Sequence, residues 1–235
     1  MLAGAAAAGF DAVGLDDMTL AGRDADEVAL LLQENGLTCT DVAVLRADDG
    51  VPAQAESLAA LATATGAGVC IAALATRSAA SIDNLRDGAA ILAEAGVRTA
   101  LEFVPYGGVR TLSEGVDVCA EIGWDRCGLL LDSWHFFRAG EDWDLLSSLA
   151  PEQIALVHVN DAPPLVGDLA YESRFRRTAP GDGTFPLAEF LDALEAIGYE
   201  GVVSLEVLSA SLRSRPPAEG ARELHDSVLS IRRVV

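Results

Sequence analysis

Residues 127–134 read CGLLLDSW, and this short run determines how the rest of the chain is interpreted. Five apolar or glycine positions stand in succession and then give way to Asp132. A continuous apolar run of this length, without alternating polar residues, is typical of a strand that is buried on both faces. Such strands occur in parallel sheets that are covered by helices or closed into a barrel. The run therefore predicts a parallel α/β fold with a carboxylate at the carboxyl end of one strand.

Six further apolar runs of the same kind recur along the chain. The first six of the seven runs begin at near-constant intervals of about 30 residues. The other runs are FDAVGLDD (10–17), TCTDVAVL (38–45), GVCIAAL (68–74), TALEFVPY (99–106), IALVHVND (154–161) and GVVSLEVLS (201–209). Helical patterns lie between them, for example at residues 24–36, 78–96 and 185–198, and the last of these places its apolar residues on roughly one face.

This alternation predicts an α/β barrel of the TIM (β/α)8 type, with a single domain spanning residues 1–235. A barrel of this class has eight strands, whereas the sequence shows seven. Residues 2–10, LAGAAAAGF, have the pattern of the end of a helix that leads into the first visible strand. The simplest interpretation is that this chain lacks the first strand and part of its helix. An open doubly wound sheet of seven strands is the alternative, and the regular repeat favours the barrel.

The composition excludes several classes of protein. Of the 235 residues, 51% are hydrophobic, so the chain can form a large core and is not disordered. The 36 acidic residues against 16 basic ones give a formal charge of −20, which opposes nucleic-acid binding and suits divalent cations. The four cysteines lack Cys-x-x-Cys spacing, and no apolar stretch has the length needed to cross a bilayer. We therefore expect a cytoplasmic protein without a structural zinc site, a nucleic-acid partner or a membrane contact.

Lone ionisable residues stand near the carboxyl ends of the last four predicted strands: Glu102, Asp132, His158 and Glu206. Each by itself is more often a helix cap, a loop salt bridge or a satisfied core histidine than a metal ligand. Four of them on consecutive strands meet at one end of a barrel, where burial requires that they be paired or metal-bound. Three carboxylates and one imidazole form an oxygen-rich ligand set, which suits Mn²⁺ or Mg²⁺ better than Zn²⁺. We expect Mn²⁺, with Mg²⁺ or Co²⁺ as alternatives.

This set of residues resembles the xylose-isomerase-like TIM barrel superfamily, the sugar phosphate isomerase/epimerase family. The shared pattern is Glu, Asp-x-x-His, His and Glu on the last four strands, in which His135 completes the Asp-x-x-His element. The segment RRTAPGDGTFPL (176–187) is similar to the family's Arg-x-x-Pro-Gly-x-Gly element after the seventh strand. The resemblance runs from about residue 9 to residue 209. Members include ketose 3-epimerases, hydroxypyruvate isomerase, inosose dehydratase, 3-dehydroshikimate dehydratase and endonuclease IV enzymes.

The resemblance implies roles for individual residues. The metal ligands would be Glu102, Asp132, His158 and Glu206. The two glutamates would also act as acid and base on opposite faces of the substrate carbon, and His135 would contact the substrate oxygen beside the metal.

Two further residues are expected to bind the substrate. Arg177, the arginine of the Arg-x-x-Pro-Gly element, would hydrogen-bond a substrate hydroxyl or carboxylate. The loop between His158 and this arginine is longer than in the epimerases, so Arg174 and Arg176 are alternatives for the role, and the loop would act as a lid or reach a partner subunit. Trp134 is expected either to form an apolar wall beside the substrate or to pack the barrel mouth.

The expected activity is isomerisation or epimerisation of a ketose or polyol-like substrate. A divalent metal would polarise the carbonyl and stabilise the enediolate that forms when a neighbouring carbon loses its proton. Loss of a β-hydroxyl would instead give a dehydratase of the inosose or 3-dehydroshikimate type, and a catalytically inactive binding relative is a further alternative. The edge left by an absent strand would favour a homodimer.

Overall fold

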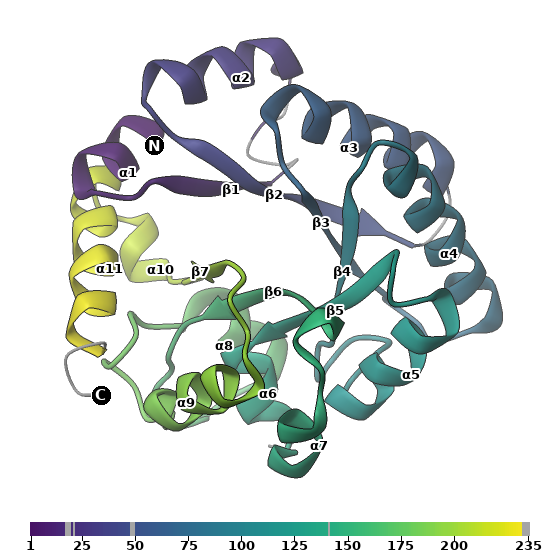
Figure 1. Cartoon of the computed structure of the whole chain (residues 1–235). Coiled ribbons are helices and arrows are strands. Elements are labelled where there is room, and N and C mark those ends of the chain that lie inside the picture. The colour runs from purple at the N-terminus through teal and green to yellow at the C-terminus, as the bar shows by residue number, and fades with distance from the viewer. Residues whose placement is uncertain (17–19, 21, 48–49, 141, 232–235) are drawn as a thin grey trace.

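The centre of the structure, a computed structural model that describes residues 1–16, 20, 22–47, 50–140 and 142–231, is a parallel sheet of seven strands (Figure 1). The strands are β1 (Ala12–Asp16), β2 (Thr38–Arg46), β3 (Val69–Ala73), β4 (Arg98–Glu102), β5 (Cys127–Asp132), β6 (Ile154–Val159) and β7 (Val203–Leu205). Each strand pairs in parallel with the next one in sequence, and together they form a nearly closed barrel. A doubly wound sheet reverses its strand order at a switch point, so the unbroken order rules out that alternative. The predicted barrel is confirmed.

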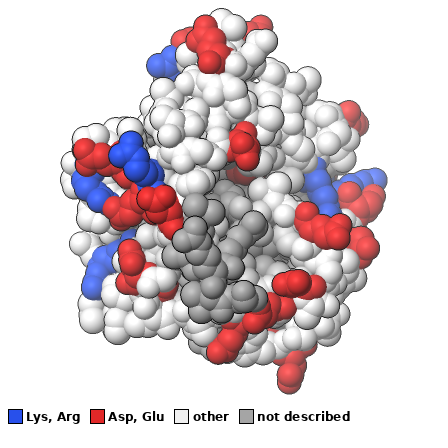
Figure 2. Space-filling view, turned by 60° about the vertical axis from the view of Figure 1, so that its left-hand side comes forward, with Lys and Arg blue, Asp and Glu red and all other residues white. Residues whose placement is uncertain are grey.

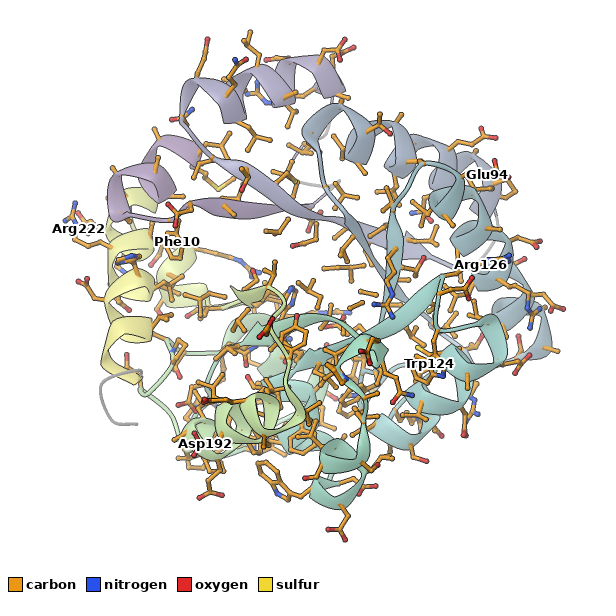
Figure 3. The ribbon with its side chains drawn as sticks, viewed as in Figure 1. Phe10, Glu94, Trp124, Arg126, Asp192 and Arg222 are labelled. Atoms are coloured by element: carbon orange, nitrogen blue, oxygen red, sulfur yellow. The ribbon has the colours of Figure 1, made fainter. Side chains whose placement is uncertain are left out.

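Helices cover the outside of the barrel. They are α1 (Leu2–Ala8), α2 (Ala25–Glu34), α3 (Val51–Thr65), α4 (Ala79–Glu94), α5 (Leu112–Ile122), α6 (Ser133–Ala139), α7 (Trp143–Ser148), α8 (Leu169–Phe175), α9 (Leu187–Ile197), α10 (Ala210–Arg213) and α11 (Pro217–Ile231), with a 3₁₀ turn η1 (Pro151–Gln153) before β6. The helical patterns at residues 24–36, 78–96 and 185–198 correspond to α2, α4 and α9. Glu94 of α4 and Asp192 of α9 point away from the barrel (Figure 3), as expected for amphipathic helices on a sheet.

Side chains of the central strands alternate between two apolar layers. One residue from each of β3 to β6 lies in the inner layer, inside the barrel: Ile71, Ala100, Leu130 and Leu156. Leu129 and Leu131, on either side of Leu130, belong instead to the larger core between the strands and the helices. The absence of polar alternation in CGLLLD is explained by this burial on both faces, since all six residues of β5 are buried.

The same alternation directs polar side chains into the mouth of the barrel. Successive residues of a strand point to opposite faces, so a residue two positions after an inner-layer residue points inward again. Glu102, Asp132 and His158 each lie two residues after the inner-layer residue of their strand. The inner layer is therefore the apolar floor beneath these three side chains.

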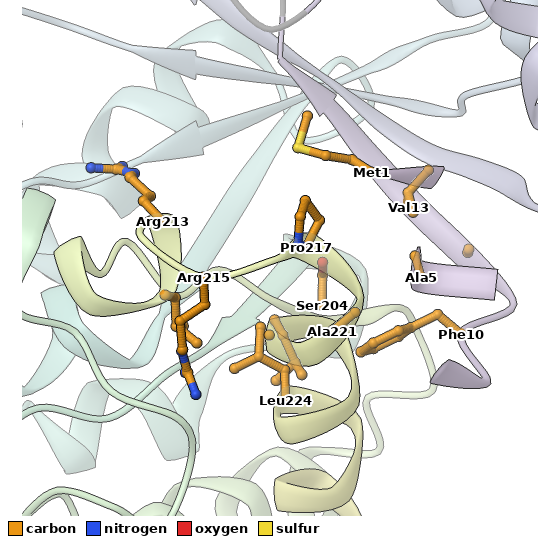
Figure 4. A pocket seen from close by; sticks show the side chains of 15 residues that line it. Met1, Ala5, Phe10, Val13, Ser204, Arg213, Arg215, Pro217, Ala221 and Leu224 are labelled. Carbon is orange, nitrogen blue, oxygen red and sulfur yellow. The ribbon is translucent and has the colours of Figure 1, made fainter. Parts of the chain in front are cut away.

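An apolar groove of about 540 Å³ lies between β1 and β7 (Figure 4). Within the described residues no ladder joins these two strands, and Val203 on β7 is 44% exposed. On the outside α1 packs against α11, where a Cβ on Gly4 would lie 3.1 Å from the backbone of Ala218. The ring of Phe10 meets His225 of α11 edge-on, with 5.3 Å between ring centroids. The helical layer is thus continuous where the sheet is not.

Acidic residues are spread over the surface. In Figure 2 Asp and Glu side chains occur across the face shown, while basic side chains gather mainly at its sides, in line with the net charge of −20. In the part of the chain that the structure describes, no helix combines the length and the apolar character required to cross a membrane.

The inner layer provides a test of the fold. Leu130→Ala is expected to lower the free energy of unfolding by about 2–5 kcal/mol, because the deleted atoms leave a cavity inside the barrel. Leu30→Ala on α2, where the leucine is 54% exposed, is the matched control and should change it by less than about 0.5 kcal/mol. Urea unfolding followed by circular dichroism measures both, and equal effects of the two variants would contradict the placement of Leu130.

Candidate metal centre

Four ionisable side chains meet at the carboxyl ends of β4 to β7. Glu102 and Asp132 are the last residues of β4 and β5, His158 is the next-to-last residue of β6, and Glu206 directly follows β7. One ligand atom from each of the four lies within 4.8 Å of the others. Asp132 and His158 are buried, and the two glutamates are partly exposed. The structure thus brings together all four residues that the sequence singles out as candidate ligands.

Asp132 joins the end of β5 to the start of α6. Its Oδ1 accepts a hydrogen bond from the backbone N–H of His135 at 3.1 Å, which makes Asp132 the N-cap of the helix. Aspartate is favoured at this position because its carboxylate satisfies an N–H group that has no partner within the helix. The strand-to-helix junction therefore fixes both members of the Asp-x-x-His element in the barrel mouth.

His158 faces the carboxylates with a nitrogen that has no hydrogen-bond partner among the described residues. Its Nδ1 lies 3.8 Å from Glu206 Oε2 and 4.0 Å from Asp132 Oδ2. Burial by itself lowers the pKa of His158, but the interaction with Glu206 and the charges of Asp132 and Asp41 outweigh burial and raise this pKa to about 9. A buried nitrogen that faces two carboxylates without a hydrogen bond is consistent with a cation shared between them.

Arg177 lies in the middle of the site with its side chain buried. Its Nη1 donates to Asp132 Oδ2 and to Glu206 Oε2, both at 2.8 Å, while Nε donates to the carbonyl of Ser173 at 2.9 Å and Nη2 to the Ser173 hydroxyl at 2.8 Å. Burial alone would lower the pKa of Arg177, but the carboxylates hold it above its ordinary value. For Glu206 burial alone would raise the pKa, but the charges of Arg177 and then His158 lower this pKa to about 2. Arg177 and Glu206 are therefore both charged at neutral pH.

Aromatic side chains form one side of the site. The His135 Nε2 atom lies 3.3 Å from Glu102 Oε1 and 3.3 Å from Arg177 Nη2. Trp134 is fully buried, with the guanidinium carbon of Arg177 5.7 Å from its ring centroid, and it packs edge-on against His135 at 5.3 Å. The ring of Tyr106 lies 6.3 Å from Trp134 and 6.1 Å from His135. Trp134 thus supports Arg177 from within the protein by a cation–π contact.

The long loop after β6 holds a residue that the sequence interpretation left unassigned. The loop contains α8, and Ser173 lies on this helix, four residues before Arg177 in the sequence. The carbonyl and the hydroxyl of Ser173 both accept hydrogen bonds from the Arg177 guanidinium. That i, i+4 spacing is the signal by which sequence reasoning could have found the serine. Of the two alternative arginines, Arg174 is exposed and Arg176 forms an ion pair at 2.7 Å with a glutamate of α8. Arg177 is therefore the arginine that the structure places in the site.

The charges and donor atoms of the cluster fit a divalent cation. The three carboxylates carry a charge of −3 and Arg177 carries +1, which leaves −2 when His158 is neutral. A divalent ion would balance this remainder, and three carboxylates with one imidazole form a ligand set that is rich in oxygen. The residues at this site could therefore hold a divalent metal once His158 has lost its proton.

Comparison with known proteins identifies related enzymes. The family model described as "Xylose isomerase-like TIM barrel" matches residues 2–231. The chain is 36% identical over 140 residues to a 3-dehydroshikimate dehydratase of Pseudomonas aeruginosa, an alignment that covers 59% of this chain and 22% of that protein. It is 33% identical over 141 residues to an inosose isomerase of Bacillus velezensis, which covers 57% of this chain and 49% of that protein. The chain thus spans about half or less of the length of these curated relatives.

The fold is also found in a solved structure. The structure described as the IOLI protein with a binding zinc atom superposes with a TM-score of 0.86 and 22% sequence identity, and covers 98% of this chain and 91% of that chain. At this identity the likeness concerns the fold, whereas the family model matches nearly all of this sequence. The chain belongs to the xylose isomerase-like TIM barrel family.

Proposed function

We propose that this chain is a divalent-metal-dependent isomerase or epimerase of a ketose or polyol-like substrate. The observation that carries the proposal is the cluster of Glu102, Asp132, His158 and Glu206, whose ligand atoms lie within 4.8 Å of one another. The relative named inosose isomerase supports an isomerase. The oxygen-rich ligand set favours Mn²⁺, with Mg²⁺ or Co²⁺ as alternatives, over Zn²⁺.

The two glutamates of the cluster would then take a proton from the substrate and give one to it. When bound, a divalent metal supplies a positive charge that polarises a substrate carbonyl. Glu206 would accept the proton from the carbon beside that carbonyl, a step that requires its pKa to rise from the value of about 2 that Arg177 and His158 impose. Glu102, protonated from water before the step, would give a proton to the substrate: delivery to the neighbouring carbon gives isomerisation, and delivery to the other face of the same carbon gives epimerisation. Proton exchange with water would then restore both glutamates. His135 would hydrogen-bond the reacting oxygen through Nε2, which already lies 3.3 Å from Glu102.

Arg177 and Trp134 would contribute differently to binding. Each nitrogen of the Arg177 guanidinium already donates to a protein acceptor. A substrate hydroxyl or carboxylate would therefore be bound by exchange of one of these hydrogen bonds. Trp134 is buried beneath the guanidinium and would keep its plane fixed during that exchange.

A dehydratase is the second candidate function. The relative named 3-dehydroshikimate dehydratase, which is 36% identical to this chain over 140 residues, favours it. After the same proton abstraction, Glu102 would give its proton to a hydroxyl group β to the carbonyl. The carbon–oxygen bond would break, water would leave, and a carbon–carbon double bond would form.

Metal binding is expected to release a proton. His158 of the metal-free protein is protonated at pH 7, because its pKa is about 9, and must become neutral to ligate a metal. Calorimetric titration with Mn²⁺ at pH 7 in buffers of different ionisation enthalpy should show release of about one proton, and the release should fall to about half that value near pH 9. His225→Ala, which alters a histidine on α11, should release the same number. Binding at pH 7 without proton release would contradict the assignment of His158.

The two glutamates should be essential for turnover. With saturating Mn²⁺, ketoses, inososes and 3-dehydroshikimate are screened as substrates. On any substrate that reacts, Glu102→Gln or Glu206→Gln should lower kcat by about 10²–10⁴-fold, since each amide can neither accept nor return a proton. Glu195→Gln, on the exposed face of α9, is the control and should keep full activity. Full activity of either site variant would show that the acid/base assignment is wrong.

Substitution of Asp132 should weaken metal binding, whereas substitution of His135 should abolish turnover and leave metal binding nearly unchanged. Asp132→Asn keeps a side-chain oxygen for the N-cap of α6 but lacks the negative charge, so Mn²⁺ affinity should fall at least tenfold. His135→Gln should leave Mn²⁺ affinity within about threefold while turnover is lost, because this side chain is placed on the substrate oxygen. Calorimetry and activity assays on both variants test whether the two residues have these different roles. An equal fall of Mn²⁺ affinity in both variants would refute the assignment.

A further inference from the structure

Asn160, the first residue after β6, is completely buried beside the metal centre. Its Nδ2 donates a hydrogen bond to Asp132 Oδ2 at 3.0 Å. Its backbone N–H donates to the hydroxyl of Ser133 at 3.0 Å, and its backbone carbonyl accepts from the same hydroxyl at 2.7 Å. The main chain of Asn160 is therefore held by Ser133, while its carboxamide is directed at the carboxylate.

The two oxygens of Asp132 have different partners. Oδ1 accepts from the backbone N–H of His135 at 3.1 Å, and Oδ2 accepts from Asn160 at 3.0 Å and from Arg177 at 2.8 Å. Oδ2 lies 4.0 Å from the Nδ1 of His158, so it is the oxygen that faces the other candidate ligands. A carboxylate that is hydrogen-bonded at both oxygens is held in one orientation.

The anchoring of the loop does not by itself require a carboxamide at this position. The backbone hydrogen bonds with Ser133 would remain with an apolar side chain. A buried amide without a partner destabilises the folded protein. The donor that the amide directs at a candidate metal ligand is what distinguishes Asn160 from a simple packing residue.

We propose that Asn160 is a positioning residue of the metal centre, whose carboxamide, together with the backbone N–H of His135, holds the Asp132 carboxylate in the orientation that directs Oδ2 at the other candidate ligands. The inference rests on the proposed metal site and deepens it. Asn160 therefore raises the affinity of the site for a divalent metal, because it orients one of the candidate ligands.

The test substitutes the carboxamide and measures metal binding, which needs no substrate. Asn160→Leu is similar in size and lacks the donor. Its affinity for Mn²⁺, measured by calorimetry on the full chain, should fall by about 10- to 100-fold, the usual effect of losing a group that orients a ligand. The visible absorption bands of the Co²⁺-loaded protein should shift.

Ser133→Ala is the matched control. It removes the hydrogen bonds to the backbone of Asn160 and a longer one, at 3.4 Å, to its Oδ1, but leaves the Nδ2 donor that faces Asp132. Its Mn²⁺ affinity should therefore stay within about threefold and its Co²⁺ spectrum should be unchanged. Circular dichroism checks that each variant is folded, and Asn160→Ala replaces Asn160→Leu if the leucine does not fit.

Three results would overturn the inference. Unchanged Mn²⁺ affinity and an unchanged Co²⁺ spectrum in a folded Asn160 variant would exclude a positioning role. Equal losses in the Asn160 and Ser133 variants would show that the residue acts only by placing the loop. Failure of the unaltered chain to bind Mn²⁺ would overturn the proposed metal site as well, and is thereby distinguished from the first two results.

Discussion

The ion pairs of Arg177 with Asp132 and Glu206 are the interaction on which the rest of the site depends. Three carboxylates converge at the mouth of the barrel, and their mutual repulsion would be costly in a partly buried position without a compensating charge. The guanidinium lies at 2.8 Å from two of them. Neighbouring elements keep it there, because α8 binds it through Ser173 and the indole ring of Trp134 lies beneath it. The long loop, the aromatic cluster and the strand ends thus converge on one cation.

Much of this arrangement could be predicted from the sequence, because it follows from local patterns. Apolar runs at a regular interval predict parallel strands, and the ends of the last four runs locate the polar residues that meet in the site. What could not be predicted depends on contacts between distant elements. Three arginines stand close together, and only the fold of α8 places Arg177 rather than Arg174 or Arg176 in the site. The bond from Asn160 to Asp132 depends on how β5 pairs with β6, and that register shifts between Leu129 and Leu130.

The relatives of this chain carry two different reaction names, isomerase and dehydratase. Removal of one proton beside a carbonyl can begin either reaction, and the outcome depends on where the next proton is delivered. The ligand cluster would serve the shared step. The choice of product would then depend on groups that face the substrate from outside the cluster.

The groove between β1 and β7 also affects the site itself. Glu102 is carried by β4, which has a paired strand on each side, whereas Glu206 follows β7, which pairs only with β6 within the described residues. The two glutamates are therefore held by supports of unequal stiffness. Glu206 is tied to the cluster through its ion pair with Arg177, whereas Glu102, Asp132 and His158 are also fixed by strands that pair on both sides. The topology thus gives Arg177 a second task, which is to hold in place the one candidate ligand that stands beside an edge strand.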